Sequence, residues 1–252
     1  MLKINSSFKN LLSKAILLSC IYINFDCNRK LDLPLDEMKA AVILEEKGYK
    51  INQKTLKSGQ HIHTIEIGLK TKYEKQDLSA ICDIPTLKNL SFDGINFPEI
   101  SEDALLSCGK SNINNFIFGN VKFQNDSFCS LLKKKENSEL KLSFYYSMIN
   151  QEQIRCISEI ETLTNLGLDG DLNITDDDFC AFSKKSKNLT FLRLNYSNLG
   201  KKSMECILNF PKLTSVMLQD WKNVPSAEHF KTMEEYEEKY GRKIEKLIND
   251  TY

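Results

Sequence analysis

The sequence has no excess of either charge. Its 252 residues include 34 Lys and Arg against 34 Asp and Glu, which gives a formal net charge of zero. Attraction to a nucleic-acid backbone or to an anionic membrane surface draws on an excess of positive charge. We therefore expect no nucleic-acid partner.

Glycine and proline are also few. The chain has ten Gly and five Pro, and they do not gather into the Pro-rich or Gly/Ser-rich runs that connect domains. Because 41% of the residues are apolar, the chain can bury a sizeable core. These features predict one continuous body behind an N-terminal segment.

Signatures of catalysis and of metal binding are absent as well. The sequence has no Gly-x-Ser-x-Gly elbow, no phosphate-binding Gly loop and no Cys-x-x-Cys pair. Of the three His, His61 and His63 share one face of an expected strand near Glu66, while His229 is far along the chain. A metal site at the first two is conceivable, but no third ligand is dictated. We expect no enzyme activity, no cofactor and no metal.

What the sequence does contain is one phrase repeated three times. Leu163–Leu168 reads LTNLGL, Leu189–Leu194 reads LTFLRL and Leu213–Leu218 reads LTSVML. The alternation places two apolar side chains on one face of a short strand, and successive phrases must stack to bury that face. A helical segment follows the first phrase, where Ile174–Phe182 reads ITDDDFCAF.

These motifs resemble those of leucine-rich repeat proteins. The phrases match the L-x-x-L-x-L core, and ITDDDF is similar to the I-T-D-x-x-L segment of cysteine-containing, ribonuclease-inhibitor-like repeats and of many bacterial leucine-rich repeat proteins. The resemblance implies an α/β fold, a leucine-rich repeat solenoid in which a right-handed β-α superhelix bends into a horseshoe with helical caps.

Counting the phrases predicts about seven repeats of about 25 residues. Their first positions, separated by 25, 26, 26, 24, 26 and 24 residues, are Ile62, Leu87, Ile113, Glu139, Leu163, Leu189 and Leu213. The fourth repeat has two registers, because Leu140, Leu142 and Phe144 all alternate. We expect Leu142 and Phe144 to be buried, since this register aligns Ile149 with the corresponding apolar residues of other repeats.

A helix start is expected in the second half of each repeat. Asn150 and Thr175 suit the N-cap position, and Asp176 and Asp177 suit the positive end of a helix. The same expectation holds in an earlier repeat for Ser101, Glu102 and Asp103. The run Asp176–Asp178 lacks the spaced ligands and central Gly of an EF-hand, so we interpret it as a helix start rather than a calcium loop.

The spacing of the elements predicts the shape of the stack. Neighbouring strands lie about 4.8 Å apart, whereas neighbouring helices need about 8–10 Å, so the stack should curve with the strands inside.

The chain divides into four expected segments. Residues 1–30 are a signal- or lipoprotein-like segment, and residues 31–60 are an N-terminal cap with a helix over 36–47 and a strand over 49–52. Residues 61–225 hold the repeats, beginning with a strand over 61–69. Residues 226–252 are a C-terminal capping helix, running over about 227–240 and resuming to 249 after the break at Gly241.

The N-terminal segment has the proportions of an export signal. Lys3, Lys9 and Lys14 precede the apolar run 15–25, which is too short to span a membrane. The sequence LLSC ending at Cys20 resembles a bacterial lipobox, in which the Cys is lipidated. We expect an exported protein, periplasmic or at the cell surface, with Cys20 as the candidate lipid attachment. Export by another route and an ordinary N-terminus stay open as alternatives.

Six of the eight cysteines fall one to a repeat, in the helical halves: Cys82, Cys108, Cys129, Cys156, Cys180 and Cys206. Disulfides between neighbouring repeats are one alternative. Helices about 8–10 Å apart, however, exceed the Cα separation of less than about 7 Å that a disulfide requires. We therefore expect buried thiols that fill the space between helices and sheet.

The solvent side of the strands is the candidate binding surface. Its outward positions include Ile117, Tyr145, Asp169, Phe191, Arg193, Asn195, Met217 and Gln219. Aromatic, Met and Arg residues of this kind are enriched at the centres of protein interfaces. The alternative is a merely soluble face on which the large residues are scattered singly.

The leading hypothesis is a non-catalytic, monomeric interaction module that binds a protein or peptide through the concave strand face. One alternative is a structural envelope component without a specific ligand. Another is the recognition subunit of an enzyme complex, which the lack of an F-box-like segment in residues 1–60 disfavours.

Overall fold

The structure, a computed structural model, describes residues 36–69, 71–72, 74, 77–94, 106, 108–121, 127–133, 135 and 139–249. The signal-like segment with Cys20 lies outside these residues, as do the expected helix-start residues Ser101, Glu102 and Asp103. Among the described helices, none combines the length and the apolar composition that crossing a membrane requires.

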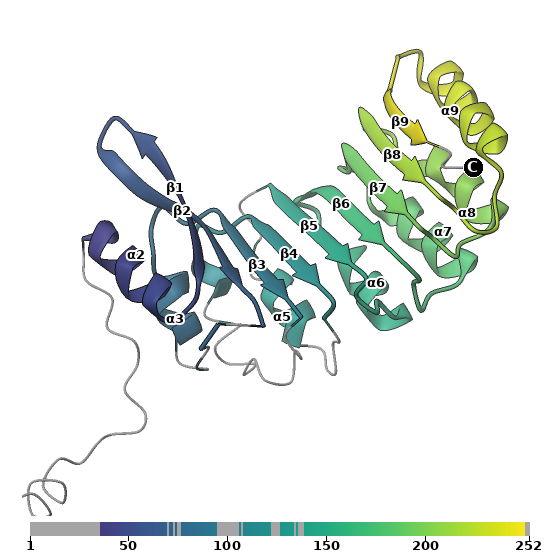
Figure 1. The fold of residues 1–252 in the computed structure, drawn as a ribbon. Helices are drawn as coiled ribbons and strands as arrows, with labels where there is room; N and C mark the ends of the chain where they lie inside the picture. Colours follow the sequence, from purple (N-terminus) through teal and green to yellow (C-terminus); the bar gives the residue numbers. More distant parts are fainter. Residues whose placement is uncertain are drawn as a thin grey trace, which may run out of the picture.

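Nine strands form one sheet in chain order. Their bounds are β1 Lys50–Leu56, β2 Gly59–Ile67, β3 Asn89–Asp93, β4 Asn115–Gly119, β5 Leu140–Tyr145, β6 Leu163–Asp169, β7 Phe191–Asn195, β8 Ser215–Gln219 and β9 Glu245–Asn249. The hairpin of β1 and β2 is antiparallel, and every later pair is parallel. Since each parallel strand lies beside the next along the chain, the chain advances by one strand per turn, as in a repeat solenoid (Figure 1).

Helices lie along one face of the sheet, and all except the first of them connect parallel strands (Figure 1). Their bounds are α2 Glu37–Glu46, α3 Asp77–Cys82, α5 Ser127–Lys133, α6 Gln151–Ile157, α7 Asp176–Lys185, α8 Lys201–Cys206 and α9 Ser226–Tyr240, with 3-10 turns η2 Cys108–Lys110 and η3 Ile207–Asn209. The chain is therefore an α/β protein of alternating strands and helices. The number of repeats and the horseshoe curvature stay predictions.

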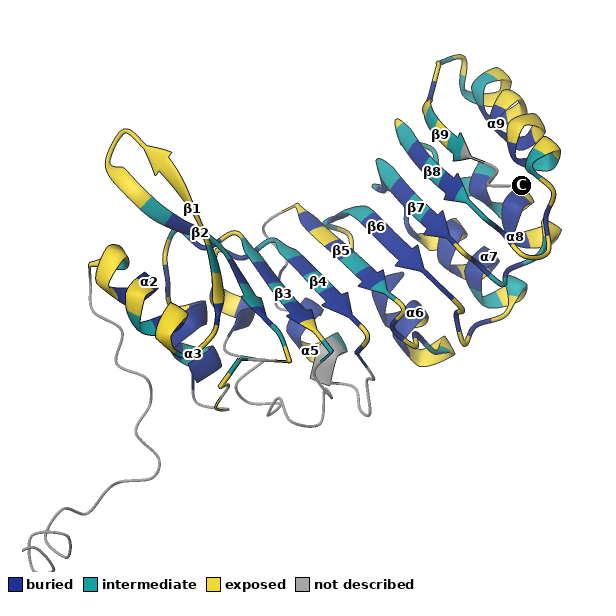
Figure 2. Ribbon diagram, in the orientation of Figure 1, coloured by how far each residue is buried: buried dark blue, intermediate teal, exposed yellow. Residues whose placement is uncertain are grey.

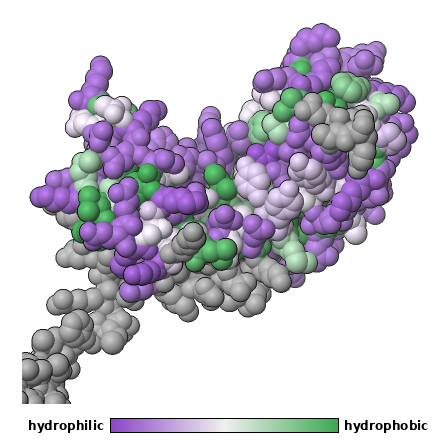
Figure 3. All heavy atoms as spheres, viewed as in Figure 1, coloured by the Kyte–Doolittle hydropathy of each residue, from purple (hydrophilic) through white to green (hydrophobic). Residues whose placement is uncertain are grey.

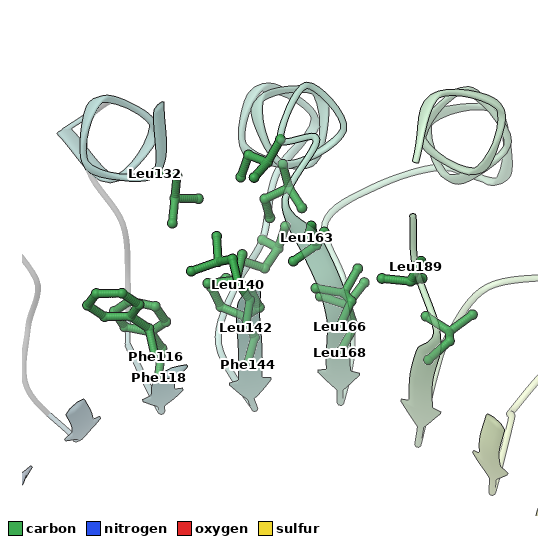
Figure 4. Packing of buried hydrophobic residues seen from close by; sticks show 14 of the residues in the cluster. Phe116, Phe118, Leu132, Leu140, Leu142, Phe144, Leu163, Leu166, Leu168 and Leu189 are labelled. Atoms are coloured by element: carbon green, nitrogen blue, oxygen red, sulfur yellow. The ribbon is translucent and has the colours of Figure 1, made fainter. Parts of the chain in front are cut away.

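The core lies between the helices and the sheet. Figure 4 shows leucines and phenylalanines of β4, β5 and β6 pointing from the strands toward the helices. Phe92, Phe118 and Phe144 stack from strand to strand, with ring centroids 5.5 and 5.3 Å apart. Figure 2 shows the buried and the more exposed positions alternating along several strands, which is the two-residue period that the repeated phrases predict.

The fourth phrase confirms the expected register. Leu142 and Phe144 are fully buried, and Ile149 is buried with them. Glu139, however, does not take the first position of the phrase. An irregularity between Leu140 and Lys141 leaves Leu140 paired with Leu163, so Leu140 is the buried residue there. The extra residue lies in β6, because the successive residues Leu140 and Lys141 pair with Leu163 and Asn165. Leu163 is therefore buried beside Leu140, although strict alternation with Leu166 would turn it outward.

A left-handed residue follows six strands in succession. These residues, whose φ lies between 50° and 101°, are Gly94, Asn120, Tyr146, Gly170, Tyr196 and Asp220. The backbone N–H of Tyr146 donates to the carbonyl of Asp169 on the next strand at 2.8 Å, and that of Tyr196 does the same to Gln219. This turn gives the ends of β3 to β7 one further hydrogen bond to the next strand. The repeated phrases alone do not predict this turn.

The N-terminal cap has the expected helix. The Asp36 carboxylate accepts a hydrogen bond from the N–H of Met38, and Gly48 ends the helix with a φ of 87°. Behind the helix, Asp77 is fully buried and accepts hydrogen bonds from Lys47 and Tyr49. The hairpin is longer than predicted, because β1 continues to Leu56 rather than ending near residue 52.

The C-terminal cap differs from the expectation beyond Gly241. Helix α9 ends there with a φ of 63°, but the helix does not resume. Residues 245–249 form β9, which pairs in parallel with β8. Without β9, β8 would be the edge strand and would leave backbone groups unpaired. Ile248 packs against the core while Leu247 stays exposed, so an alternating strand suits this segment better than a helix.

The expectation of free thiols was wrong. Disulfides join Cys82 to Cys108, Cys129 to Cys156, and Cys180 to Cys206, with Cα separations of 5.0, 5.8 and 5.2 Å. The error lay in using the distance between helix axes. Each helix has a Cα radius of about 2.3 Å, so residues on the facing sides of two helices approach about 4.6 Å closer than the axes do.

Candidate functional site

The strand face is the side of the sheet opposite the helices. In the part of the chain that the structure describes, no helix lies on this face (Figure 1). Its surface is mostly hydrophilic in the view of Figure 3, with small separate hydrophobic patches rather than one apolar band. A partner of this face would therefore meet a mixture of polar and apolar groups.

The eight predicted surface residues all lie on strands, at outward positions. Ile117 is on β4, Tyr145 on β5, Asp169 on β6, Phe191, Arg193 and Asn195 on β7, and Met217 and Gln219 on β8. The register aligns Ile117, Ser143, Gly167, Arg193 and Met217 in one row across the sheet, and Tyr145, Asp169, Asn195 and Gln219 in the next. Their role in binding stays a prediction.

Arg193 brings three strands together. Its side chain reaches from β7 across β6, where Nε lies 3.0 Å from both carboxylate oxygens of Asp169. The guanidinium carbon then lies 4.4 Å from the centre of the Tyr145 ring on β5. Such an ion pair stacked on an aromatic ring fixes the guanidinium in one place. We call Tyr145, Gly167, Asp169, Arg193 and Asn195 the arginine cluster.

Gly167 makes room for this crossing. A Cβ atom at position 167 would lie only 2.6 Å from Nη2 of Arg193, closer than non-bonded atoms approach. The guanidinium therefore lies directly over the glycine, between Arg193's own strand and Tyr145. A side chain at this position would push it away.

Burial dominates the electrostatics of the arginine cluster. The side chains of Arg193 and Asp169 are only 15% and 7% exposed. Burial raises the pKa of the Asp169 carboxyl above its ordinary value, although Arg193 and a backbone hydrogen bond from Asn195 oppose this change. With Asp169 ionised, its charge cancels that of Arg193, so the cluster as a whole is neutral.

Two buried polar atoms of the arginine cluster lack a hydrogen-bond partner among the described residues. They are Nη2 of Arg193 and Oδ1 of Asn195. The amide nitrogen of Asn195 donates to the sulfur of Met217 at 3.5 Å. Because a thioether only accepts hydrogen bonds, this contact fixes the amide with its nitrogen toward Met217. A buried donor or acceptor without a partner costs about 1–3 kcal/mol.

The remaining predicted residues surround the arginine cluster or lie apart from it. Phe191 and Met217 are half-buried next to it on β7 and β8, and Gln219 pairs in register with Asn195. Ile117 lies on β4, beside the strand of Tyr145 and with two strands between it and β7. The structure thus gathers most of the predicted surface into one place rather than scattering its large residues singly.

Two exposed tyrosines at the strand ends, Tyr146 and Tyr196, are not among the predicted surface residues. Tyr146 and Tyr196 are 61% and 43% exposed. They follow β5 and β7, and although β6 lies between these strands, the two ring centroids are 6.3 Å apart. Gly170 stands between them, so no side chain separates the rings. Both tyrosines have the left-handed backbone that disfavours bulky residues. The signal available in the sequence was their position, one residue past the predicted strands.

The histidines and the acidic run 176–178 contact other groups of the chain. His61 lies beside Ser58 and Glu37, whereas His63 lies beside Asn89. No group of three metal-binding side chains occurs among the described residues. In the acidic run, Asp176 accepts hydrogen bonds from the backbone N–H of Gly200 and the hydroxyl of Ser203, and Asp178 closes the capping box of α7 with Thr175. This confirms the helix-start interpretation of 176–178.

Comparisons with known proteins add little to this geometry. No family model matches the chain, and no curated protein matches it. Among solved structures, the chain is similar to one in the crystal structure of the Rad7 and Elc1 complex in yeast, with 16% identity and a TM-score of 0.37. The match covers 68% of this chain and 60% of that chain, so the protein spans less than two thirds of the length of the yeast chain. A likeness this weak assigns neither a family nor a function.

Proposed function

We propose that the protein is a non-catalytic leucine-rich repeat module of the bacterial type that binds a protein or peptide partner through its strand face. The single observation that carries the proposal is the arginine cluster on an uncovered sheet face. Tyrosine and arginine held rigidly side by side are typical of the residues that dominate binding energy at protein interfaces.

The repeat assignment draws support from the spacing of the chain. The left-handed residues Gly94, Asn120, Tyr146, Gly170, Tyr196 and Asp220 follow one another at 24 to 26 residues, the same spacing as the repeated phrases. A solenoid of such repeats would bend with its strands inside, because strands pack more closely than helices. The strand face would then be the concave face of a horseshoe.

A matched pair of variants tests the binding face. The double substitution Phe191→Ala, Arg193→Ala alters the strand face, whereas Lys184→Ala, Lys185→Ala alters exposed residues of α7 on the helical side. A partner isolated with the wild-type protein should bind the first variant at least tenfold more weakly and the second unchanged. Equal binding by both variants would move the site away from the strands.

We also propose that the protein is exported to an oxidising compartment, periplasmic or at the cell surface, where Cys20 is the candidate lipid attachment. The three disulfides support export, because structural disulfides persist outside the reducing cytosol. Mass spectrometry of the mature N-terminus tests this proposal. A mature chain beginning with a lipidated Cys20 is expected, and an intact Met1 would contradict it.

A further inference from the structure

Two unpaired atoms of the arginine cluster are complementary to one kind of ligand. Nη2 of Arg193 is a donor that lacks an acceptor, and Oδ1 of Asn195 is an acceptor that lacks a donor, within the described residues. The two residues are two positions apart on β7, so their side chains leave the same face of the sheet. Asn195 is only 6% exposed, so its amide oxygen is hidden from bulk water.

We propose that Arg193 and Asn195 form a subsite for an uncharged amide group on an extended segment of the partner protein. This inference rests on the proposed function and adds the chemistry of the ligand. The primary amide of an Asn or Gln side chain has its carbonyl and one N–H on the same side, so it offers an acceptor to Arg193 and a donor to Asn195. In an extended segment, side chains alternate between two faces, so such an amide can point toward the sheet.

The charge of the cluster favours an amide over a carboxylate. Arg193 is already paired with Asp169, whose two oxygens lie 3.0 Å from its Nε. An incoming carboxylate would meet Asp169 as well as Arg193, and it would bring no donor for Asn195. A neutral group that both donates and accepts satisfies the two unpaired atoms without adding charge.

Access to the subsite requires movement of side chains only. The Tyr145 ring stacks on the guanidinium, and Met217 contacts the Asn195 amide. Both covering side chains are partly exposed, and both turn about single bonds without a change in the backbone. Together with Phe191, they offer apolar surface to the side chains that flank the bound amide.

A random heptapeptide library displayed on phage, panned against the full chain, provides the probe. We expect enriched peptides that carry Asn or Gln between apolar residues. Replacing that Asn or Gln by Asp or Glu in the best peptide should weaken its binding at least tenfold, as measured by calorimetry. Tighter binding of the acidic peptide would overturn the proposal in favour of a carboxylate site.

Variants of the chain test whether Arg193 and Asn195 bind the amide of the peptide. Asn195→Leu keeps the size of the side chain but removes the acceptor, and Arg193→Lys keeps the charge but removes Nη2. Each should weaken the best peptide about tenfold. Asn115→Leu is the control, because Asn115 lies on the same face at β4 and bonds to Asn89 instead. Circular dichroism and the melting temperature establish that each variant is folded.

The outcomes separate this inference from the proposed function. Peptides that lose binding to Phe191→Ala but not to Asn195→Leu or Arg193→Lys would overturn the amide subsite and leave the strand face as the binding surface. Peptides indifferent to all three substitutions would contradict both. Failure to enrich any peptide would also count against the subsite, because a site for a short extended segment should select one from such a library.

Discussion

Single residues decide how the strand face is built, and Gly167 is the clearest case. Alternation along the repeated phrase predicted that position 167 points outward, and the structure places it there. The phrase could not predict that Arg193 from the next strand lies over it, because a side chain's direction across strands depends on its neighbours. The same holds for Tyr146 and Tyr196, whose rings meet only because Gly170 leaves space between them.

Gly167→Ala should displace the guanidinium of Arg193, since the new methyl group would lie 2.6 Å from Nη2. We expect a loss of about 1–2 kcal/mol in the free energy of unfolding, in the usual range for a substitution that forces a buried side chain to move. Urea denaturation measures it. Gly68→Ala is the control, because its nearest neighbour, a carboxylate oxygen of Glu66, lies 4.0 Å away. Equal stability of the two variants would refute the close packing.

Lys135 predicts a pH dependence of stability. Its side chain is buried and donates to the carbonyl and hydroxyl oxygens of Ser111 at 2.7 and 3.0 Å. Burial, with a smaller effect of Lys88, lowers its pKa to about 8 from 10.5. Between these two pH values the unfolded chain binds more protons than the folded one, so this residue makes stability rise with pH.

The difference between wild type and Lys135→Met isolates that contribution from other groups that titrate in the same range. The wild-type protein should gain free energy of unfolding relative to the variant from about pH 8 to 10, by at most about 1.4 kcal/mol per pH unit. Lys133→Met is the control, because Lys133 is largely exposed. If the free energies of unfolding of wild type and Lys135→Met change in parallel with pH, folding does not lower the pKa of Lys135.

At the scale of elements, the sequence predicted those features that depend on local chemistry. The capping residues Asp36, Asn150 and Thr175 start helices as expected. The predictions that were wrong concern features that depend on tertiary contacts. Residues 245–249 form a strand because the edge of β8 is available to them, and the cysteines pair because they lie on the facing sides of neighbouring elements.

The junction between the cap and the first helical connection depends on Asp77. This carboxylate at the start of α3 is fully buried and holds Lys47 and Tyr49 from the end of the cap helix and the start of the hairpin. Asp77→Ala should cost about 2–4 kcal/mol, because it leaves the Lys47 ammonium, only 26% exposed, without its partner.

Hydrogen exchange shows which part of the chain is destabilised by Asp77→Ala. In Asp77→Ala, the amides of α2 should exchange faster, while those of α7 keep their protection, since few contacts connect distant parts of a solenoid. Glu74→Ala is the control. Glu74 is exposed, and its oxygen lies 4.0 Å from the Lys47 nitrogen, so its removal should change stability by less than about 1 kcal/mol. Uniform acceleration throughout the chain would contradict a local role for Asp77.

For the whole molecule, the disulfides join neighbouring helical segments in pairs. Each bridge closes a loop of 26 or 27 residues, about one step along the sheet. A solenoid has only contacts between neighbours, so each bridge restrains the part of the stack in which it lies.

Removing one bridge by Cys180→Ala, Cys206→Ala should lower the free energy of unfolding by about 3 kcal/mol, as expected for a loop of this length. The urea midpoint measured without reductant gives the difference. With reductant present, the wild-type protein should fall to the level of the variant or below. A variant as stable as the oxidised wild type would show that the bridge does not form.

Site-specific photo-crosslinking tests the central claim, that the strand face binds the partner, most directly. A photoreactive phenylalanine analogue replaces Phe191 on β7 in one sample and Phe230, exposed on α9, in another. Illumination with the partner present should give a covalent adduct from position 191 and none from position 230. An adduct from position 230 alone would place the partner on the helical side and contradict the account.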